Sequence, residues 1–383
     1  MDHARLLGIF IGLSICLPIP SHAHASDIQK DNLEILSQSG DGRFLLATPK
    51  SGQFVVLDSA TLEQISPTLE PEDPQSVTLS YDGTRLAVSD ANAKLSFFDS
   101  KSGKLVSSAV MSLTSKPQTY NGLNVHLLVY SRDGQEIVLV SNELIIIVDV
   151  MRGREITRIN SPDNWRMPFA QAELNGDKTK LLTTDGHRHP ARLWDAHTGK
   201  LLRILDDPLG REAETHVAIF SPDGQLMVTG EDILEKEKNR YLTAVRIREC
   251  RSGRIVLESE LDGEVLALAF SQDGKQLAAA GRRTRVFDVT KFKPMTKILR
   301  SETLDEITRV AFSPDGKYVM ANAPIGLTTV WEMRTQKVVY SGRDGDITSF
   351  AGFAAVGHVL ITCEFTGSGR NPTRTVNAWE LPK

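Results

Sequence analysis

Short runs of apolar residues alternate with turn-forming residues along most of the chain. The clearest stretch is AFSPDGKYVMANAPIGLTTVWEM, residues 311–333, where Asp315 and Gly316 form a strong hairpin signal. The apolar runs at 318–320 and 329–331 have the length and residue types of short strands. A hairpin of this size is not stable alone in water, so these strands are predicted to belong to a larger sheet.

The same pattern recurs through the sequence. A turn flanked by apolar runs is found at 39–48, 80–89, 131–140, 174–183, 221–230, 271–280, 313–322 and 354–363. Each turn is followed by a second apolar run that ends in a large residue and an acid: Asp58, Asp99, Asp149, Asp195, Glu249, Asp288, Glu332 and Glu380, at steps of 39 to 54 residues. Most of these acids precede another turn and strand, so one unit predicts four antiparallel strands.

Such a unit cannot bury both faces of its sheet alone, but radial stacking of neighbours would bury them. The predicted fold class is therefore all-β, a β-propeller of four-stranded antiparallel blades. Eight units predict eight blades, with seven blades and one irregular unit as the alternative. The last unit ends after its third strand, and a strand at about 26–32 is expected to supply the fourth and close the ring.

The repeats resemble those of the WD-repeat family over about residues 33–383. The shared features are the Ser-Pro-Asp-Gly turn, the Trp-Asp or Trp-Glu ending and the Thr-Gly-Lys turn after it. The family's Gly-His is missing almost everywhere, and only Trp194, Trp331 and Trp379 keep the tryptophan. In the fourth unit Thr184, Asp185 and Trp194 match the family's hydrogen-bonded set, while no histidine is assigned to it. The resemblance implies a scaffold and leaves its partner open.

Composition and charge narrow the function classes. The chain has 383 residues, of which 24% are charged, and its formal net charge is −4. The sequence contains no long block of like charge, which argues against nucleic-acid binding. Glycine and proline are scattered, so residues 26–383 are predicted to form a single domain.

The first 25 residues have the pattern of a secretory signal peptide. Arg5 precedes an apolar run at 6–19, and Ala23 and Ala25 form an A-x-A cleavage site. The predicted mature protein starts at 26, is exported to the periplasm or the extracellular space and has no membrane span. An uncleaved anchor and a lipid on Cys16 are alternatives. The other two cysteines, Cys250 and Cys363, lie in separate units and are predicted to be free thiols.

Candidate partner-binding residues lie off the repeat pattern. The connections at 109–124, 160–171 and 206–215 are long, and loops on a rigid scaffold commonly carry function. Exposed aromatic and arginine side chains often anchor interfaces, so Tyr120, Trp165 and Arg166 are candidates. The alternative is that Trp165 fixes its loop to its own domain. The last candidates, His126 and His216, share a register at the start of the innermost strand and could line the channel mouth.

Metal binding has only weak candidates. His187 and His189 stand two residues apart in a loop, whereas a closed site needs three or four ligands. Glu214, Glu264 and Glu306 share a register in three consecutive units and could crowd one arc of the axial opening, where they would attract a cation or a basic peptide. Solvated loop acids are the alternative. No cofactor is predicted.

No nucleophile elbow, phosphate-binding glycine loop or zincin helix is found in the sequence. The sequence therefore favours a non-enzymatic exported propeller that binds a protein or peptide. A metal- or cofactor-dependent propeller enzyme, a lactonase-like hydrolase with its site at the axial mouth, is one alternative. A structural envelope-assembly component is another.

Overall fold

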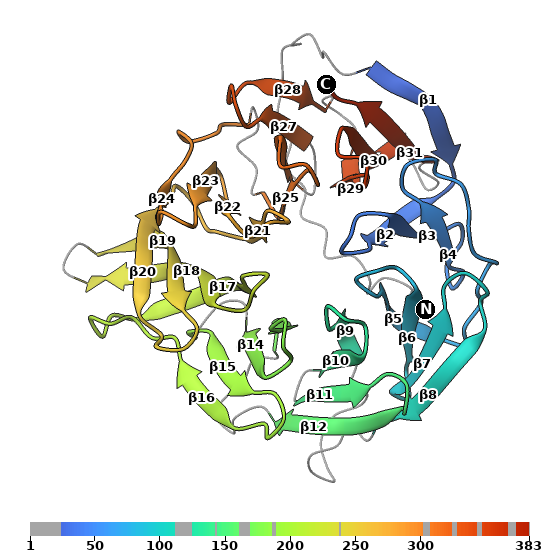
Figure 1. The fold of residues 1–383 in the computed structure, drawn as a ribbon, viewed down its shortest axis with the longest axis horizontal. Helices are drawn as coiled ribbons and strands as arrows, with labels where there is room; N and C mark the ends of the chain where they lie inside the picture. Colours follow the sequence, from blue (N-terminus) through green and yellow to red (C-terminus); the bar gives the residue numbers. More distant parts are fainter. Residues whose placement is uncertain are drawn as a thin grey trace.

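The described residues of the computed structural model form a closed ring of β-sheets (Figure 1). The structure describes residues 24–111, 125–141, 144–160, 169–185, 189–236, 239–301, 307–323, 328–342, 347–366 and 373–382. Within these ranges there are eight antiparallel sheets, numbered here as blades 1 to 8 in chain order. In each blade the first strand lies nearest the axis and the last strand lies at the rim. The prediction of an eight-bladed all-β propeller is confirmed.

Blades 1 to 4 follow one another along the first half of the chain. Blade 1 has β2 (Glu34–Gln38), β3 (Phe44–Thr48) and β4 (Val55–Asp58), and blade 2 has β5 (Pro74–Leu79), β6 (Arg85–Asp90), β7 (Lys94–Asp99) and β8 (Leu105–Val110). Blade 3 has β9 (Val125–Tyr130), β10 (Glu136–Ser141), β11 (Leu144–Asp149) and β12 (Arg154–Asn160), and blade 4 has β13 (Gln171–Leu174), β14 (Lys180–Thr184), β15 (Arg192–Asp195) and β16 (Leu201–Ile204).

Blades 5 to 8 complete the ring. Blade 5 has β17 (Ala213–Phe220), β18 (Leu226–Glu235), β19 (Arg240–Glu249) and β20 (Ile255–Glu260), and blade 6 has β21 (Ala267–Phe270), β22 (Gln276–Ala280), β23 (Thr284–Asp288) and β24 (Lys293–Pro294). Blade 7 has β25 (Arg309–Phe312), β26 (Tyr318–Asn322), β27 (Thr328–Glu332) and β28 (Val338–Ser341), and blade 8 has β29 (Ile347–Phe353), β30 (Val359–Thr366), β31 (Thr373–Glu380) and β1 (His24–Asp31).

The repeated Ser-x-Asp-Gly sequence makes the turn between the first two strands of a blade. In blade 7 the Ser313 hydroxyl donates to Asp315 Oδ1 at 2.7 Å and accepts from the Tyr318 N–H at 2.9 Å. Gly316 has φ +68°, a conformation that glycine adopts without a steric penalty. These local bonds account for the recurrence of the motif, because each turn needs the same residue types.

The tryptophans at the repeat position pack between neighbouring blades, as the sequence predicts. Trp194 belongs to a buried cluster with Val138 and Ile147 of blade 3. Trp331 packs in a cluster shared by blades 6 and 7, and the Trp379 ring lies 5.3 Å from the Tyr340 ring of blade 7. The contacts between blades, rather than each sheet alone, therefore form the hydrophobic core.

The chain's N-terminal strand closes the ring, as predicted. β1 pairs with β31 in antiparallel register, with Gln29 opposite Asn377 and Asp31 opposite Thr375. The strand begins at His24, two residues before the expected start, and its register is interrupted between Ala25 and Gln29. Blade 8 thus combines one N-terminal strand with three C-terminal strands.

Blade 1 departs from the predicted four-stranded unit, because its described sheet has three strands. The segment at the outer edge forms only isolated bridges, Leu57 to Gln64 and Phe54 to Leu69. Pro67 lies between these bridges and has no N–H for a continuous ladder, and the Ser66 hydroxyl accepts the Val56 N–H instead at 2.8 Å.

The two cysteines of the predicted mature chain are buried and unpaired, Cys250 in blade 5 and Cys363 in blade 8. Their separation agrees with the expectation of free thiols. Among the described residues there is no helix of the length and apolar character needed to cross a membrane.

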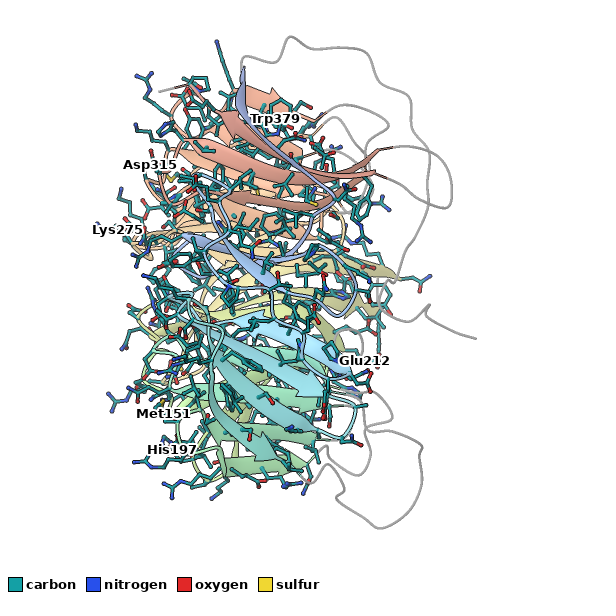
Figure 2. The ribbon with its side chains drawn as sticks, turned by 90° about the vertical axis from the view of Figure 1, so that its right-hand side faces the viewer. Met151, His197, Glu212, Lys275, Asp315 and Trp379 are labelled. Atoms are coloured by element: carbon teal, nitrogen blue, oxygen red, sulfur yellow. The ribbon has the colours of Figure 1, made fainter. Side chains whose placement is uncertain are left out.

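The ring has two unlike faces (Figure 2). The turn face carries the Asp-Gly turns and the second turn of each blade, and Asp315, Lys275, Met151 and His197 lie along it. The connection face carries the segments that link one blade to the next, and Glu212 lies there.

Candidate functional site

Several candidates from the sequence lie outside the described residues. These are Tyr120, Trp165, Arg166, His187 and Glu306. The predictions that they bind a partner or a metal remain predictions.

The two histidines that share a register make different contacts. Nε2 of His126 lies 2.7 Å from the Phe169 carbonyl oxygen of the next blade, and the rest of this side chain is exposed. His216 is buried, with Nε2 3.2 Å from Asp232 Oδ2. The contact to Asp232 gives His216 a structural role within blade 5 and leaves little of its surface for a partner.

The other described metal candidates do not come together. Glu214 is half-buried on β17, opposite Asp232, and Glu264 is exposed between blades 5 and 6. His189 forms an ion pair with the buried carboxylate of Asp185. In the part of the chain that the structure describes, no group of three or more His, Cys, Asp or Glu side chains could hold a metal.

The structure corrects the assignment of the WD-type set in the fourth unit. The Trp194 indole N–H donates to Thr183 Oγ1 at 2.9 Å, so Thr183 rather than Thr184 is the tryptophan's partner. Nδ1 of His189 contacts Asp185, which places a histidine beside the acid of this set. The histidine was missed because it follows the acid, at a position that the strand pattern does not define.

Blade 5 carries a variant of this set in which arginine replaces tryptophan. Arg248 occupies the tryptophan position and donates to Thr229 Oγ1 at 2.5 Å, as Trp379 donates to Thr362 in blade 8. In both blades an acid two residues after the threonine, Glu231 or Glu364, accepts the threonine hydroxyl. Blade 5 thus keeps the hydrogen bonds of the threonine and the acid, while a charged arginine takes the place of the tryptophan.

Arg246 extends this variant into a buried ionic network. Its side chain has no solvent-exposed surface and contacts three carboxylates: Asp207 at 2.5 Å, Glu231 at 2.8 Å and Glu258 at 2.7 Å. Arg248 contacts Glu231 at 2.6 Å. Each buried charge therefore has an oppositely charged partner, which a buried ion requires.

The network also holds the connection that precedes blade 5. Burial of Asp207 opposes ionisation, but hydrogen bonds from Arg211 and Arg246 outweigh it and lower the pKa of this carboxyl. Arg211 donates to both oxygens of Asp207, at 3.1 and 2.9 Å. A connection that the sequence presents as a long loop is therefore fixed to the blade.

The middle hairpin of blade 5 continues beyond the other blades, and the fixed connection runs beside it. The Leu234 N–H donates to the Glu212 carbonyl at 2.9 Å, and Lys236 pairs with the Glu212 carboxylate at 2.8 Å. Residues 206–212, 232–236 and 239–242 are called the blade 5 extension below. Ile233 and Leu242 form a small buried cluster beneath it.

The blade 5 extension exposes two large apolar side chains. Leu209 is 76% exposed and Tyr241 is 57% exposed, although both belong to segments fixed by hydrogen bonds. Sequence reasoning missed these residues. Two signals for them were present: the 54-residue step between Asp195 and Glu249, the longest of the series, and the Arg248-Glu249 pair where other units have an apolar residue before the acid.

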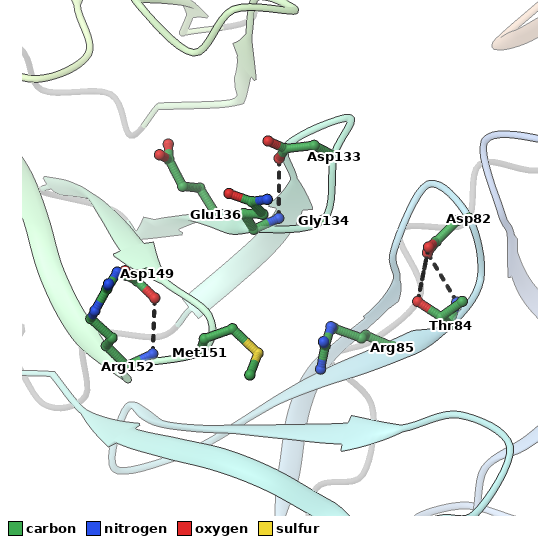
Figure 3. A pocket seen from close by; sticks show the side chains of 10 residues that line it. Asp82, Thr84, Arg85, Asp133, Gly134, Glu136, Asp149, Met151 and Arg152 are labelled. Atoms are coloured by element: carbon green, nitrogen blue, oxygen red, sulfur yellow. Dashed lines mark hydrogen bonds and ion pairs between the residues drawn. The ribbon is translucent and has the colours of Figure 1, made fainter.

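A polar cavity of about 740 Å³ lies between blades 2 and 3 on the turn face (Figure 3). Three of its carboxylates serve the turns: Asp82 accepts from Thr84, Asp133 from the Gln135 N–H and Asp149 from the Arg152 N–H. The fourth, Glu136, lies 3.5 Å from Lys178 Nζ. The carboxylates of this cavity are therefore engaged in turns and ion pairs.

The axial opening on the turn face is bridged by an arginine. Arg132 donates to the Pro222 carbonyl at 3.2 Å, and its guanidinium lies 5.0 Å from the centre of the Tyr81 ring. A Cβ on Gly40 would lie 2.1 Å from the Tyr81 ring, so this position must remain glycine for the ring to pack there. The bridge links blades 2, 3 and 5 across the axis.

The half-buried carboxyl of Glu173, on β13, lines the axial channel. Burial raises its pKa from 4.5 to about 8, despite a hydrogen bond from the Phe220 N–H at 3.4 Å. The folded protein then retains a proton that the unfolded chain loses above pH 4.5. Stability is therefore expected to decrease as the pH rises from about 4.5 to about 8.

Substitution of Glu173 tests this assignment. E173Q should be more stable than the wild type at pH 9 by about 1–2 kcal/mol, because the amide cannot ionise, and should lose the decrease between pH 5 and 8. Urea unfolding at pH 5, 7 and 9 measures the difference, with E264Q at an exposed position as the control. An unchanged pH dependence in E173Q would show that Glu173 is not the group responsible.

Comparison with known proteins supports the fold class. No family model matches the chain. An uncharacterised WD repeat-containing protein of Synechocystis is 25% identical over 154 residues, which is 40% of this chain and 40% of that protein. The Cps50 (Swd1) β-propeller domain of Myceliophteria thermophila superposes with a TM-score of 0.57 at 15% identity, over 83% of this chain and 99% of that domain.

The chain is an eight-bladed β-propeller, and part of its sequence is similar to a WD repeat-containing protein. The match to the Synechocystis protein spans less than half of either chain, and the likeness to the Swd1 domain concerns the fold alone.

Proposed function

We propose that the protein is a non-enzymatic, exported propeller that binds a protein or peptide through the blade 5 extension. The observation that carries the proposal is the exposure of Leu209 and Tyr241 on segments held rigid by the buried Arg246 network. A rigid apolar anchor loses little conformational entropy on binding, which makes aromatic and aliphatic side chains effective at interface centres. Export is inferred from the leader pattern at 1–25.

The charges around the anchors suit a polar interface rim. On the blade 5 extension Lys236 pairs with Glu212, and Arg240 pairs with Glu235, so this surface carries both signs of charge. A partner that buries about 800 Å² of this surface would cover the apolar side chains of Leu209 and Tyr241 and contact the charged residues around them. The proposed partner is therefore a folded protein or peptide with its own apolar group, rather than a polyanion.

Paired substitutions test the proposal. Immobilised wild-type protein is expected to capture its partner from an extract of the native host, while L209S/Y241A should weaken capture at least tenfold, because both anchors are removed. M151S is the matched control, since Met151 is 56% exposed on the turn face. Equal capture by all three proteins at unchanged melting temperature would contradict the proposal.

A further inference from the structure

The inner strands of blades 3 to 7 enclose an axial cavity of about 380 Å³. Most of its lining is apolar, with side chains such as Leu127, Val217 and Ala267. These residues precede the Asp-Gly turns, so the cavity lies toward the connection face. At the opposite end Arg132 bridges the axis. The volume and apolar lining are typical of sites for small ligands.

Arg309 is the positively charged side chain among the residues that line this cavity. It lines the space from β25, and its guanidinium lies 4.4 Å from the centre of the Phe350 ring. Among the described residues, no oxygen accepts a hydrogen bond from this guanidinium and no carboxylate pairs with it. Burial lowers its pKa to about 10, so the side chain remains charged at neutral pH.

Arg309 has no carboxylate partner among the described residues, whereas the two fully buried arginines of blade 5 do. Arg246 and Arg248 are paired with carboxylates in blade 5. The Arg309 side chain is only partly buried and lines the cavity, so its N–H donors are accessible to a molecule that enters there. An anion that entered the cavity would supply the missing acceptors.

The remaining polar groups of the cavity are uncharged at neutral pH. Glu173 keeps its proton there because burial raises its pKa to about 8, and Gln171 and Thr308 contribute an amide and a hydroxyl. Arg309 is then the one charged side chain among the described residues of the lining at neutral pH, and it can balance one negative charge on a ligand. Planar guanidinium groups bind carboxylates through two parallel hydrogen bonds, which matches a monocarboxylate better than a multiply charged anion.

We propose that the axial cavity binds a small monocarboxylate, with its carboxylate on Arg309 and its apolar body against the aliphatic lining. The carboxylate could belong to a free organic acid or to the C-terminus of a peptide. The site is separate from the blade 5 extension, and it does not depend on the protein-binding function proposed there.

Thermal unfolding with defined probes tests this site. Butyrate and benzoate should raise the melting temperature by several degrees at concentrations well above their dissociation constants, whereas butyramide, benzamide and equal ionic strength of sodium chloride should not. Acetyl-Ala-Leu with a free C-terminus, compared with its amide, tests the peptide source. A response to the acids alone identifies free acids as the ligand class, and a response to the peptide identifies a terminal carboxylate.

Variants at Arg309 assign the effect to its guanidinium. R309M should fold with about wild-type stability, since it removes a partly buried charge that has no carboxylate partner among the described residues, and should lose the response to carboxylates. R309K should keep a weaker response, and R132M at the other end of the axis should keep the full response. If R309M does not fold, calorimetric titration of R309K must show at least tenfold weaker binding. No response in the wild type, an equal response to the amides or an undiminished response in R309M or R309K would overturn the proposal.

Discussion

Replacing Arg246 with methionine is expected to lower the free energy of unfolding by about 3–5 kcal/mol. The substitution removes the cation shared by Asp207, Glu231 and Glu258, the first two of which are fully buried. Methionine fills similar space but leaves these carboxylates with fewer compensating charges. The large effect would therefore arise from uncompensated charge rather than from a cavity.

A surface arginine on the same hairpin provides the control. Arg240 pairs with Glu235 at 2.7 Å, but half of its side chain is exposed, so R240M should cost no more than about 1 kcal/mol. Urea unfolding compares the two variants, and hydrogen exchange should show increased opening of 206–249 in R246M. Equal stability of R246M and R240M would mean that the network does not hold the blade 5 extension.

The network should also make stability sensitive to acid. The folded-state pKa of Asp207 is lowered from its ordinary value of 3.8, so its contribution is present above that pH and is lost as the pH falls further. R246M should therefore lose less stability than the wild type on acidification below pH 4, because part of the lowering comes from Arg246.

Deletion of the closing strand is expected to have the second large effect. A chain that begins at Leu33 lacks all five paired positions between β1 and β31 and should lose on the order of 5 kcal/mol, at about 1 kcal/mol for each hydrogen-bonded position. The deletion also leaves β31 as an unpaired edge, which favours aggregation. A chain that begins at Ser26 loses only the positions at His24 and Ala25 and should lose about 2 kcal/mol, because the ladder from Gln29 to Asp31 remains.

Adding the missing strand as a peptide makes this prediction specific. The peptide SDIQKDN, residues 26–32, should restore the melting temperature of the chain that begins at Leu33. The same peptide with proline in place of Lys30 should not, because proline cannot donate to the ladder. Equal stability of the two truncated chains would contradict closure of the ring by β1.

The fold could be predicted from sequence because its signals are local. Turns such as Ser313-Pro314-Asp315-Gly316 are closed by bonds within five residues, so every copy needs the same residues. The irregular edge of blade 1 also has a local cause, since Pro67 interrupts a ladder. Because each turn depends on residues close together in the sequence, the repeats show which residue types the turns need.

The candidate sites depend on contacts between residues far apart in the sequence. Arg246 meets Asp207 across 39 positions, and the Arg309 guanidinium meets the Phe350 ring of the next blade. No periodic pattern encodes these pairs. The sequence marked blade 5 through its long step and its arginine at the tryptophan position, but these two signals do not specify which side chains of the blade are exposed.

The central claim is that the blade 5 extension binds a partner, and site-specific crosslinking tests it most directly. A photoreactive phenylalanine analogue at position 241 lies beside the proposed interface, and the same group at position 151 lies on the opposite face. After irradiation in a host extract, one defined protein or peptide should be crosslinked at 241, and R246M should reduce its yield. Crosslinking of the same partner at 151 with none at 241 would contradict the claim.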